Sequence, residues 1–174
     1  ILSDNGGKVL LSYNYFGIYN THGDLFVPNS NLGSSLSKGG FNIQAVRLND
    51  SLAVLVYYNS ASKVEDEWKE QLFFTFVDFK YDKGNGKAIP GKTNIVLRSG
   101  HIRMTDICRT FDGNYLIIAQ INEYLYMFKM DDKGVTETDS LYNPVTSGFP
   151  DVSKIVPDDK YLYLSLIHIS EPTR

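Results

Sequence analysis

A polar turn that recurs along the chain, each time directly before a short apolar strand, is the feature that most constrains the fold. Phe111–Leu116 (FDGNYL) is similar to Pro157–Leu162 (PDDKYL), and the first aspartates of these two copies are 46 residues apart. Leu48–Leu52 (LNDSL) and Ser3–Leu10 (SDNGGKVL) lead into strands in the same way. A polar turn, a buried strand and an aromatic strand that repeat every ~40–50 residues are typical of β-propeller blades. Because polar turns precede strands in any all-β protein, a sandwich or a solenoid stays the alternative.

The apolar pattern between the turns is short and alternating, which predicts β-strands almost throughout. The 12 tyrosines and 10 phenylalanines favour strands as well. The longest apolar runs are Leu52–Tyr58, which we expect to be buried on both faces, and Leu72–Phe79. Shorter strands are expected at Val9–Tyr13, Phe16–Tyr19, Leu25–Val27, Tyr115–Ala119, Tyr124–Met130 and Val135–Thr138.

Three polar segments interrupt these strands. Asp131–Gly134 (DDKG) and Tyr81–Gly86 (YDKGNG) are predicted to be tight hairpin turns, with the glycine of DDKG in the left-handed conformation. The only helix candidate is Ser62–Glu70 (SKVEDEWKE), which we interpret as an exposed loop or a single helical turn inserted in a hairpin. Val64 and Trp68 are four residues apart, so they would share one face of such a turn.

The last eleven residues, 164–174 (LSLIHISEPTR), resemble a translated sequencing adapter and are set apart from fold reasoning. Residues 1–163 are then expected to form a truncated, partial β-propeller of about three four-stranded blades and the start of another. Missing blades would be needed to close the ring, and such a fragment is expected to aggregate or associate through uncovered faces. Apolar tail residues such as Leu164 and Leu166 are expected to extend the last strand, and His168 is not taken as a site.

Four motifs occur in order along the chain: Ser3–Tyr13 with Gly17–Asn29, Leu72–Phe79 with Gly84–Asn94, Thr105–Cys108 with Asp112–Ile117, and Ile155–Leu162. Together they resemble the WD40-like or YVTN-like propellers of exported bacterial surface proteins of the gliding, type IX secretion kind. A histidine usual in that family is replaced in the stretch Arg109–Thr110, and the glycine of its SPDG turn is Asp159. The resemblance implies an extracellular or cell-surface location and a role in surface binding, adhesion or assembly.

Charge and composition argue against a nucleic-acid partner, a membrane span and an intrachain disulfide. The net charge is −3 and there is no run of Lys or Arg, so a nucleic-acid partner is not expected. No apolar stretch reaches the length of a membrane span. A single cysteine, Cys108, excludes an intrachain disulfide.

The residues most suited to chemistry do not form a recognisable catalytic pattern. His22 is expected in a surface turn and His101 at the start of a strand, while Cys108 is expected to be a small buried residue. Asp82–Gly86 is similar to the start of a calcium loop but lacks the later glutamate that completes one. We therefore assign no catalytic, cofactor-binding or metal-binding residue, and no cofactor.

Three functions stay open at this point. The first is a non-catalytic propeller module of a larger secreted or cell-surface protein, binding a protein or glycan through its blade loops. The second is a propeller enzyme of lactonase or glycosidase type, with catalytic residues mostly in missing blades. The third is an intracellular WD40-like scaffold.

Overall fold

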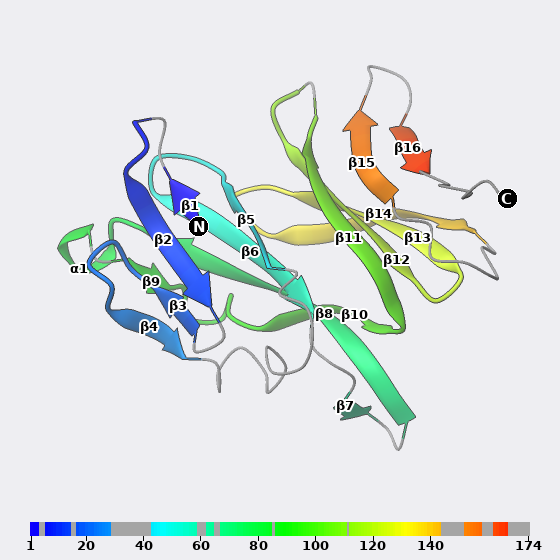
Figure 1. Cartoon of the computed structure of the whole chain (residues 1–174), viewed down its shortest axis with the longest axis horizontal. Coiled ribbons are helices and arrows are strands. Elements are labelled where there is room, and N and C mark those ends of the chain that lie inside the picture. Colours follow the sequence, from blue (N-terminus) through cyan, green and yellow to red (C-terminus); the bar gives the residue numbers. More distant parts are fainter. Residues whose placement is uncertain are drawn as a thin grey trace, which may run out of the picture. The chain divides into compact units, whose positions relative to one another are not determined.

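The computed structural model is an all-β fold with one short helical turn, α1 (Tyr81–Gly84) (Figure 1). It describes residues 1–3, 6–14, 17–28, 43–58, 62–64, 67–84, 86–110, 112–143, 152–157 and 162–166. The chain divides into two compact units, residues 1–102 and 103–174, which are described separately below.

The first unit begins with a four-stranded antiparallel meander. Its strands pair in chain order and are β1 (Leu2–Ser3), β2 (Val9–Asn14), β3 (Gly17–Tyr19) and β4 (Leu25–Pro28). Tyr13 faces Ile18 across the β2–β3 pair. The Tyr13 hydroxyl also donates a hydrogen bond to the Ile43 carbonyl at 2.8 Å, which links this meander to the start of the next one.

The second sheet of this unit follows the order β10-β8-β6-β5, so β8 and β6 are its two central strands. The path consists of β5 (Gln44–Arg47), β6 (Leu52–Tyr58), β8 (Glu67–Asp78) and β10 (Ile95–Gly100). Two short strands, β7 (Ser62–Val64) and β9 (Lys87–Ala88), also pair with β8. The twelve-residue β8 therefore has four antiparallel partners along its length.

A shared apolar core joins the two sheets of the first unit. Leu11 and Ile18 of the first sheet cluster with Leu55, Tyr57 and Phe73 of the second. The Tyr57 and Phe73 rings are stacked, with centroids 5.7 Å apart. Leu52 to Tyr57 are all buried, which confirms the prediction that this strand is covered on both faces. Each fully buried aliphatic or aromatic side chain of this kind contributes about 1.5–3 kcal/mol.

The second unit is built on another four-stranded meander. Its strands pair in chain order and are β11 (Ile102–Arg109), β12 (Tyr115–Ile121), β13 (Tyr124–Met130) and β14 (Val135–Tyr142). Cys108, Ile118 and Leu125 form its core cluster on one face. β12 is buried from Ile117 to Ile121, whereas β14 is an exposed edge strand. A separate hairpin, β15 (Val152–Pro157) and β16 (Leu162–Leu166), follows.

Three consecutive antiparallel meanders followed by a two-stranded hairpin agree with the prediction of a partial propeller. The repeated polar turn takes the same place in every sheet, between its first and second strands. In the second sheet the Asn49 side chain accepts hydrogen bonds from the Ser51 and Leu52 amides at 2.9 and 3.0 Å, so it closes the turn between β5 and β6. The turn residues Asp4–Asn5 and 158–160 lie outside the described residues. β16 does include Leu164 and Leu166, as expected, and His168 lies outside the described residues.

The prediction for residues 62–70 is wrong, because this segment is a β-hairpin. Ser62 pairs with Lys69 and Val64 pairs with Glu67. The pairing of β7 with β8 lies beyond that of β6 with β8, whose last pair is Tyr58 with Leu72. Backbone pairing along an established strand overrides the charge-rich composition, which by itself favours a loop. The side chains of Val64 and Trp68 are not described.

The two predicted glycine turns have mixed outcomes. The prediction of a tight turn at Tyr81–Gly86 is wrong, because the eight residues 79–86 connect β8 to β9. Gly84 and Gly86 have positive φ values of 94° and 81° in the reversal between β8 and β9, which also holds the turn α1. Gly134 does not have a positive φ, so its predicted left-handed conformation is wrong. The Asp131 carboxylate instead accepts hydrogen bonds from the Lys133 and Gly134 amides at 2.8 and 3.1 Å, and this closes the turn without a left-handed residue.

Candidate functional site

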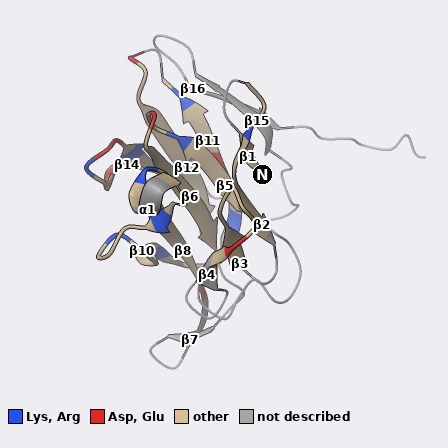
Figure 2. Cartoon of the chain, turned by 90° about the vertical axis from the view of Figure 1, so that its left-hand side faces the viewer, with Lys and Arg blue, Asp and Glu red and all other residues tan. Residues whose placement is uncertain are grey.

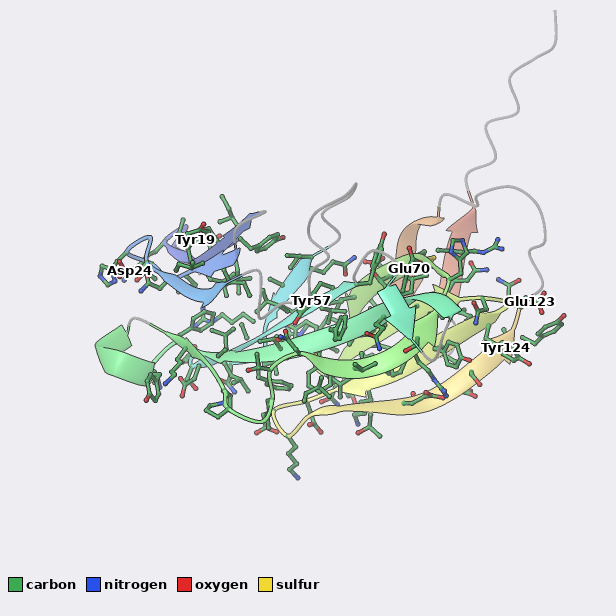
Figure 3. The ribbon with its side chains drawn as sticks, turned by 90° about the horizontal axis from the view of Figure 1, so that it is seen from below. Tyr19, Asp24, Tyr57, Glu70, Glu123 and Tyr124 are labelled. Atoms are coloured by element: carbon green, nitrogen blue, oxygen red, sulfur yellow. The ribbon has the colours of Figure 1, made fainter. Side chains whose placement is uncertain are left out.

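His22 lies in the turn between β3 and β4, as predicted, and its side chain is exposed. The turn is built by Asn20, whose side-chain oxygen accepts hydrogen bonds from the His22 and Asp24 amides at 2.9 and 2.8 Å. The His22 ring is 3.3 Å from the Thr21 hydroxyl. Figure 3 shows Tyr19 and Asp24 at the two sides of this turn. The arrangement is that of a self-supporting turn, in which the His22 amide binds Asn20 and the exposed His22 ring contacts the neighbouring Thr21.

His101 lies directly before β11, again as predicted, and it is close to an acidic group. Its Nδ1 atom is 3.6 Å from Oε2 of Glu70, which comes from β8 (Figure 3). The same carboxylate oxygen accepts a hydrogen bond from the Ile102 amide at 2.6 Å. The His101 side chain is 66% exposed and that of Glu70 is 20% exposed. Glu70 therefore anchors the connection between β10 and β11, with the imidazole at its solvent side.

Cys108 is buried in β11, which agrees with the prediction of a small buried residue. Burial, together with the nearby Asp106 carboxylate, raises the pKa of its thiol. The sulfur atom is 3.7 Å from the Leu116 carbonyl oxygen, to which the thiol donates. A raised thiol pKa disfavours the thiolate, which is the reactive form of cysteine.

Tyr57 is the centre of a buried polar network that the sequence did not reveal. Its hydroxyl is 2.8 Å from the Thr75 hydroxyl and also donates to the side-chain oxygen of Asn94. The Asn94 amide donates to Thr75 Oγ1 at 2.9 Å, and Asn94 itself has a positive φ of 55°. Burial raises the pKa of Tyr57 to about 12, against a smaller lowering by the Thr75 hydrogen bond. The network fixes the turn before β10 to the two central strands of the second sheet.

An exposed group of tyrosines lies at one end of the third sheet. Tyr124 opens β13 and pairs across the ladder with Tyr142, the last residue of β14. Their ring centroids are 5.3 Å apart in an edge-to-face arrangement, and Tyr126 is 6.0 Å from Tyr124. Tyr124 is 41% exposed and Tyr142 is 55% exposed. We refer to Tyr124, Tyr126 and Tyr142 as the tyrosine cluster.

The backbone holds the tyrosine cluster in place. Asn122 and Glu123 form the two-residue turn between β12 and β13, with Asn122 at a positive φ of 55°. The Glu123 carbonyl accepts a hydrogen bond of 2.7 Å from the amide of Asn143, directly after Tyr142. Glu123 is exposed, and Figure 3 shows it beside Tyr124 at the end of the hairpin. Sequence reasoning placed Tyr124 in a strand, but the exposure of these rings depends on the edge position of β14.

Carboxylates of the described turns bind their own backbone or nearby side chains. Asp112 receives hydrogen bonds from the Thr110 hydroxyl and from the Asn114 side chain and amide, which lower its pKa. The amides of Lys133 and Gly134 lower the pKa of Asp131 in the same way. Among the described residues, no group of three His, Cys, Asp or Glu side chains is arranged to hold a metal ion. The side chains of Asp82 and Asn85, in the segment considered as a calcium loop, are not described.

Basic and acidic positions are interspersed along the described strands and turns (Figure 2). The described part of the chain contains no helix of the length and apolar character that crossing a membrane requires.

Comparison with known proteins gives no relative. Neither the protein-family models, nor the curated proteins, nor the solved structures contain a match to this chain. Function is therefore inferred from the residues and their arrangement.

Proposed function

We propose that this chain belongs to a non-catalytic β-propeller module of a larger secreted or cell-surface bacterial protein, and that the module binds a protein or a glycan through its blade loops. The motif resemblance described above supports the location. The succession of antiparallel meanders, with the same kind of polar turn between the first and second strands, supports the propeller.

The observation that carries the binding role is the tyrosine cluster. Tyrosine combines a large apolar ring with a polar tip, and it is enriched where proteins contact their partners. Tyr124 and Tyr142 expose their rings at the strand ends, next to the β12–β13 turn, rather than packing them in the core. Exposed aromatic groups rimmed by polar residues are characteristic of interaction sites.

A test combines binding with turnover. The whole chain would be applied to an array of purified glycans and purified bacterial surface proteins, and the same preparation would be incubated with lactone and glycoside substrates. The proposal expects saturable binding to at least one array component and no product from any substrate. Turnover of a lactone or glycoside would replace it with the propeller-enzyme hypothesis. Absence of saturable binding to any component would refute the binding role.

A further inference from the structure

We infer that the tyrosine cluster is a carbohydrate site, and that its ligand class is a neutral oligosaccharide that stacks on Tyr124 and Tyr142. This inference rests on the proposed binding function and names the ligand class and the residues that recognise it.

The shape of the cluster suits the apolar face of a sugar ring. A pyranose presents a face of C–H groups, with its hydroxyls at the rim, so it can cover an aromatic ring while its hydroxyls reach polar neighbours. Tyr124 and Tyr142 are exposed by 41% and 55%, respectively. Their edge-to-face contact at 5.3 Å means that the two rings are inclined by 61° and present different surfaces to a ligand. Two adjacent sugar units can therefore each contact one ring.

The cluster is held in position before any ligand arrives. Tyr124 and Tyr142 are directly paired across the β13–β14 ladder, and the Asn143 amide is hydrogen-bonded to the Glu123 carbonyl at 2.7 Å. Tyr126 is half-buried and supports Tyr124 from the inner side, with the ring centroids 6.0 Å apart. Tyrosine also has only two side-chain torsions to fix, so binding to such a surface loses little conformational entropy.

The polar neighbours favour an uncharged sugar. Glu123 is exposed and directly precedes Tyr124, so it offers a hydrogen-bond acceptor to sugar hydroxyls. A carboxylate on the ligand would be brought close to Glu123, and like charges at such a site repel. Ser140 lies opposite Tyr126 on the exposed edge strand and adds a further hydroxyl to the rim. These groups match a hydroxyl-rich neutral ligand better than an acidic polysaccharide.

Isothermal titration calorimetry with defined oligosaccharides tests the inference. The probes are cellohexaose, laminarihexaose and the hexasaccharide of chitin, with an oligogalacturonate as the anionic comparison and a proline-rich peptide as the alternative ligand of an aromatic surface. The whole chain should bind at least one neutral hexasaccharide and should bind the oligogalacturonate at least about tenfold more weakly.

Variants then locate the site. Tyr124→Ala and Tyr142→Ala should each weaken binding by roughly tenfold or more, because each removes one stacking surface. Tyr124→Phe should stay within a factor of about two of the unsubstituted chain, since it keeps the ring. Tyr81→Ala is the matched control: Tyr81 is also 50% exposed, but it belongs to α1 in the first unit. Melting curves of every variant establish that loss of binding is not loss of folding.

The outcomes separate this inference from the broader proposal. Neutral-sugar binding that Tyr124→Ala and Tyr142→Ala both leave unchanged overturns the tyrosine cluster as the site, while a binding module remains. Equal binding of the oligogalacturonate, or binding of the proline-rich peptide alone, overturns the neutral sugar as the ligand class. If no hexasaccharide binds, the inference is wrong, and the array described above decides separately whether a binding function survives.

Discussion

Replacing Tyr57 with phenylalanine should lower the free energy of unfolding at neutral pH. In alkali it should make the variant more stable than the unsubstituted chain. The substitution keeps the ring that stacks on Phe73 but removes the hydroxyl that contacts Thr75 and Asn94. Thr75 keeps the hydrogen bond from the Asn94 amide. Asn94 is only half-buried, so water can reach its side-chain oxygen. At neutral pH the loss should therefore be modest, about 1–2 kcal/mol.

The alkaline effect follows from the pKa of Tyr57, which burial raises from 10.0 to about 12. Below pH 10 the hydroxyl is protonated in both the folded and the unfolded chain, so its contribution to stability is fully present. Between these two pKa values the unfolded chain releases the proton and the folded chain does not, so stability falls by about 1.4 kcal/mol per pH unit. The total loss is roughly 3 kcal/mol over the interval, and it is absent in Tyr57→Phe. The variant should thus become the more stable protein near the upper end of the range.

Urea unfolding of both proteins from about pH 8 to about pH 12 measures this difference, with tyrosinate absorbance as a second reading. Other titrating groups are common to both chains, so they cancel when one free energy of unfolding is subtracted from the other. Tyr81→Phe is the control, because it removes a tyrosine hydroxyl at a position that is exposed rather than buried. A Tyr57→Phe variant that declines in alkali as steeply as the unsubstituted chain would show that the hydroxyl is not buried in the native state.

Four further substitutions test other parts of the fold. Gln120 is 2% exposed, and its side-chain nitrogen has no hydrogen-bond partner among the described residues. Gln120→Met should therefore raise the free energy of unfolding, measured in urea, by about 1 kcal/mol. A clear loss of stability would instead reveal a partner for that amide. Gly113 has a φ of 83°, so Gly113→Ala should lower the free energy of unfolding by about 1 kcal/mol. Gly134 has no positive φ, so Gly134→Ala should be neutral or slightly stabilising. Equal losses in the two variants would contradict these turn geometries. At pH values above the ordinary aspartate pKa, Asp131→Ala should lower the free energy of unfolding by about 1 kcal/mol. Because the pKa of Asp131 is lowered in the folded chain, this difference between the two proteins should vanish as the pH falls through that lowered pKa. A difference that persists in acid would exclude the carboxylate as the source of the stabilisation.

The sequence predicted the strands well where local pattern and final environment agree. Leu52–Tyr58 became β6 with the predicted bounds because a continuous apolar run can only be satisfied by cover on both faces. The hairpin at residues 62–69 was missed because its pairing continues that of β6 with β8, which is a long-range cause that a charged local sequence does not reveal. Gly134 was misjudged because the neighbouring Asp131 side chain closes the turn.

The site was less accessible to prediction than the fold. His22, His101 and Cys108 occupy the kinds of position predicted for them. The tyrosine cluster was not foreseen, because Tyr124 and Tyr142 are 18 residues apart and their contact depends on the register of β13 and β14. The exposure of the two rings depends in turn on β14 being an edge strand, and the alternation of apolar residues does not specify which strand of a sheet is the edge.

Every described strand pairs only with strands of its own sheet, and this bears on how the gene can gain or lose sheets. Each meander contains both partners of every one of its hydrogen-bonded ladders, so no described pairing crosses a connection between sheets. Duplication or deletion of DNA with breakpoints in those connections would therefore add or remove a whole meander, and no strand would lose its hydrogen-bonded partner. The requirement on a newly gained copy is an apolar face that fits its neighbours, because in repeat folds the stability is set by contacts between adjacent units.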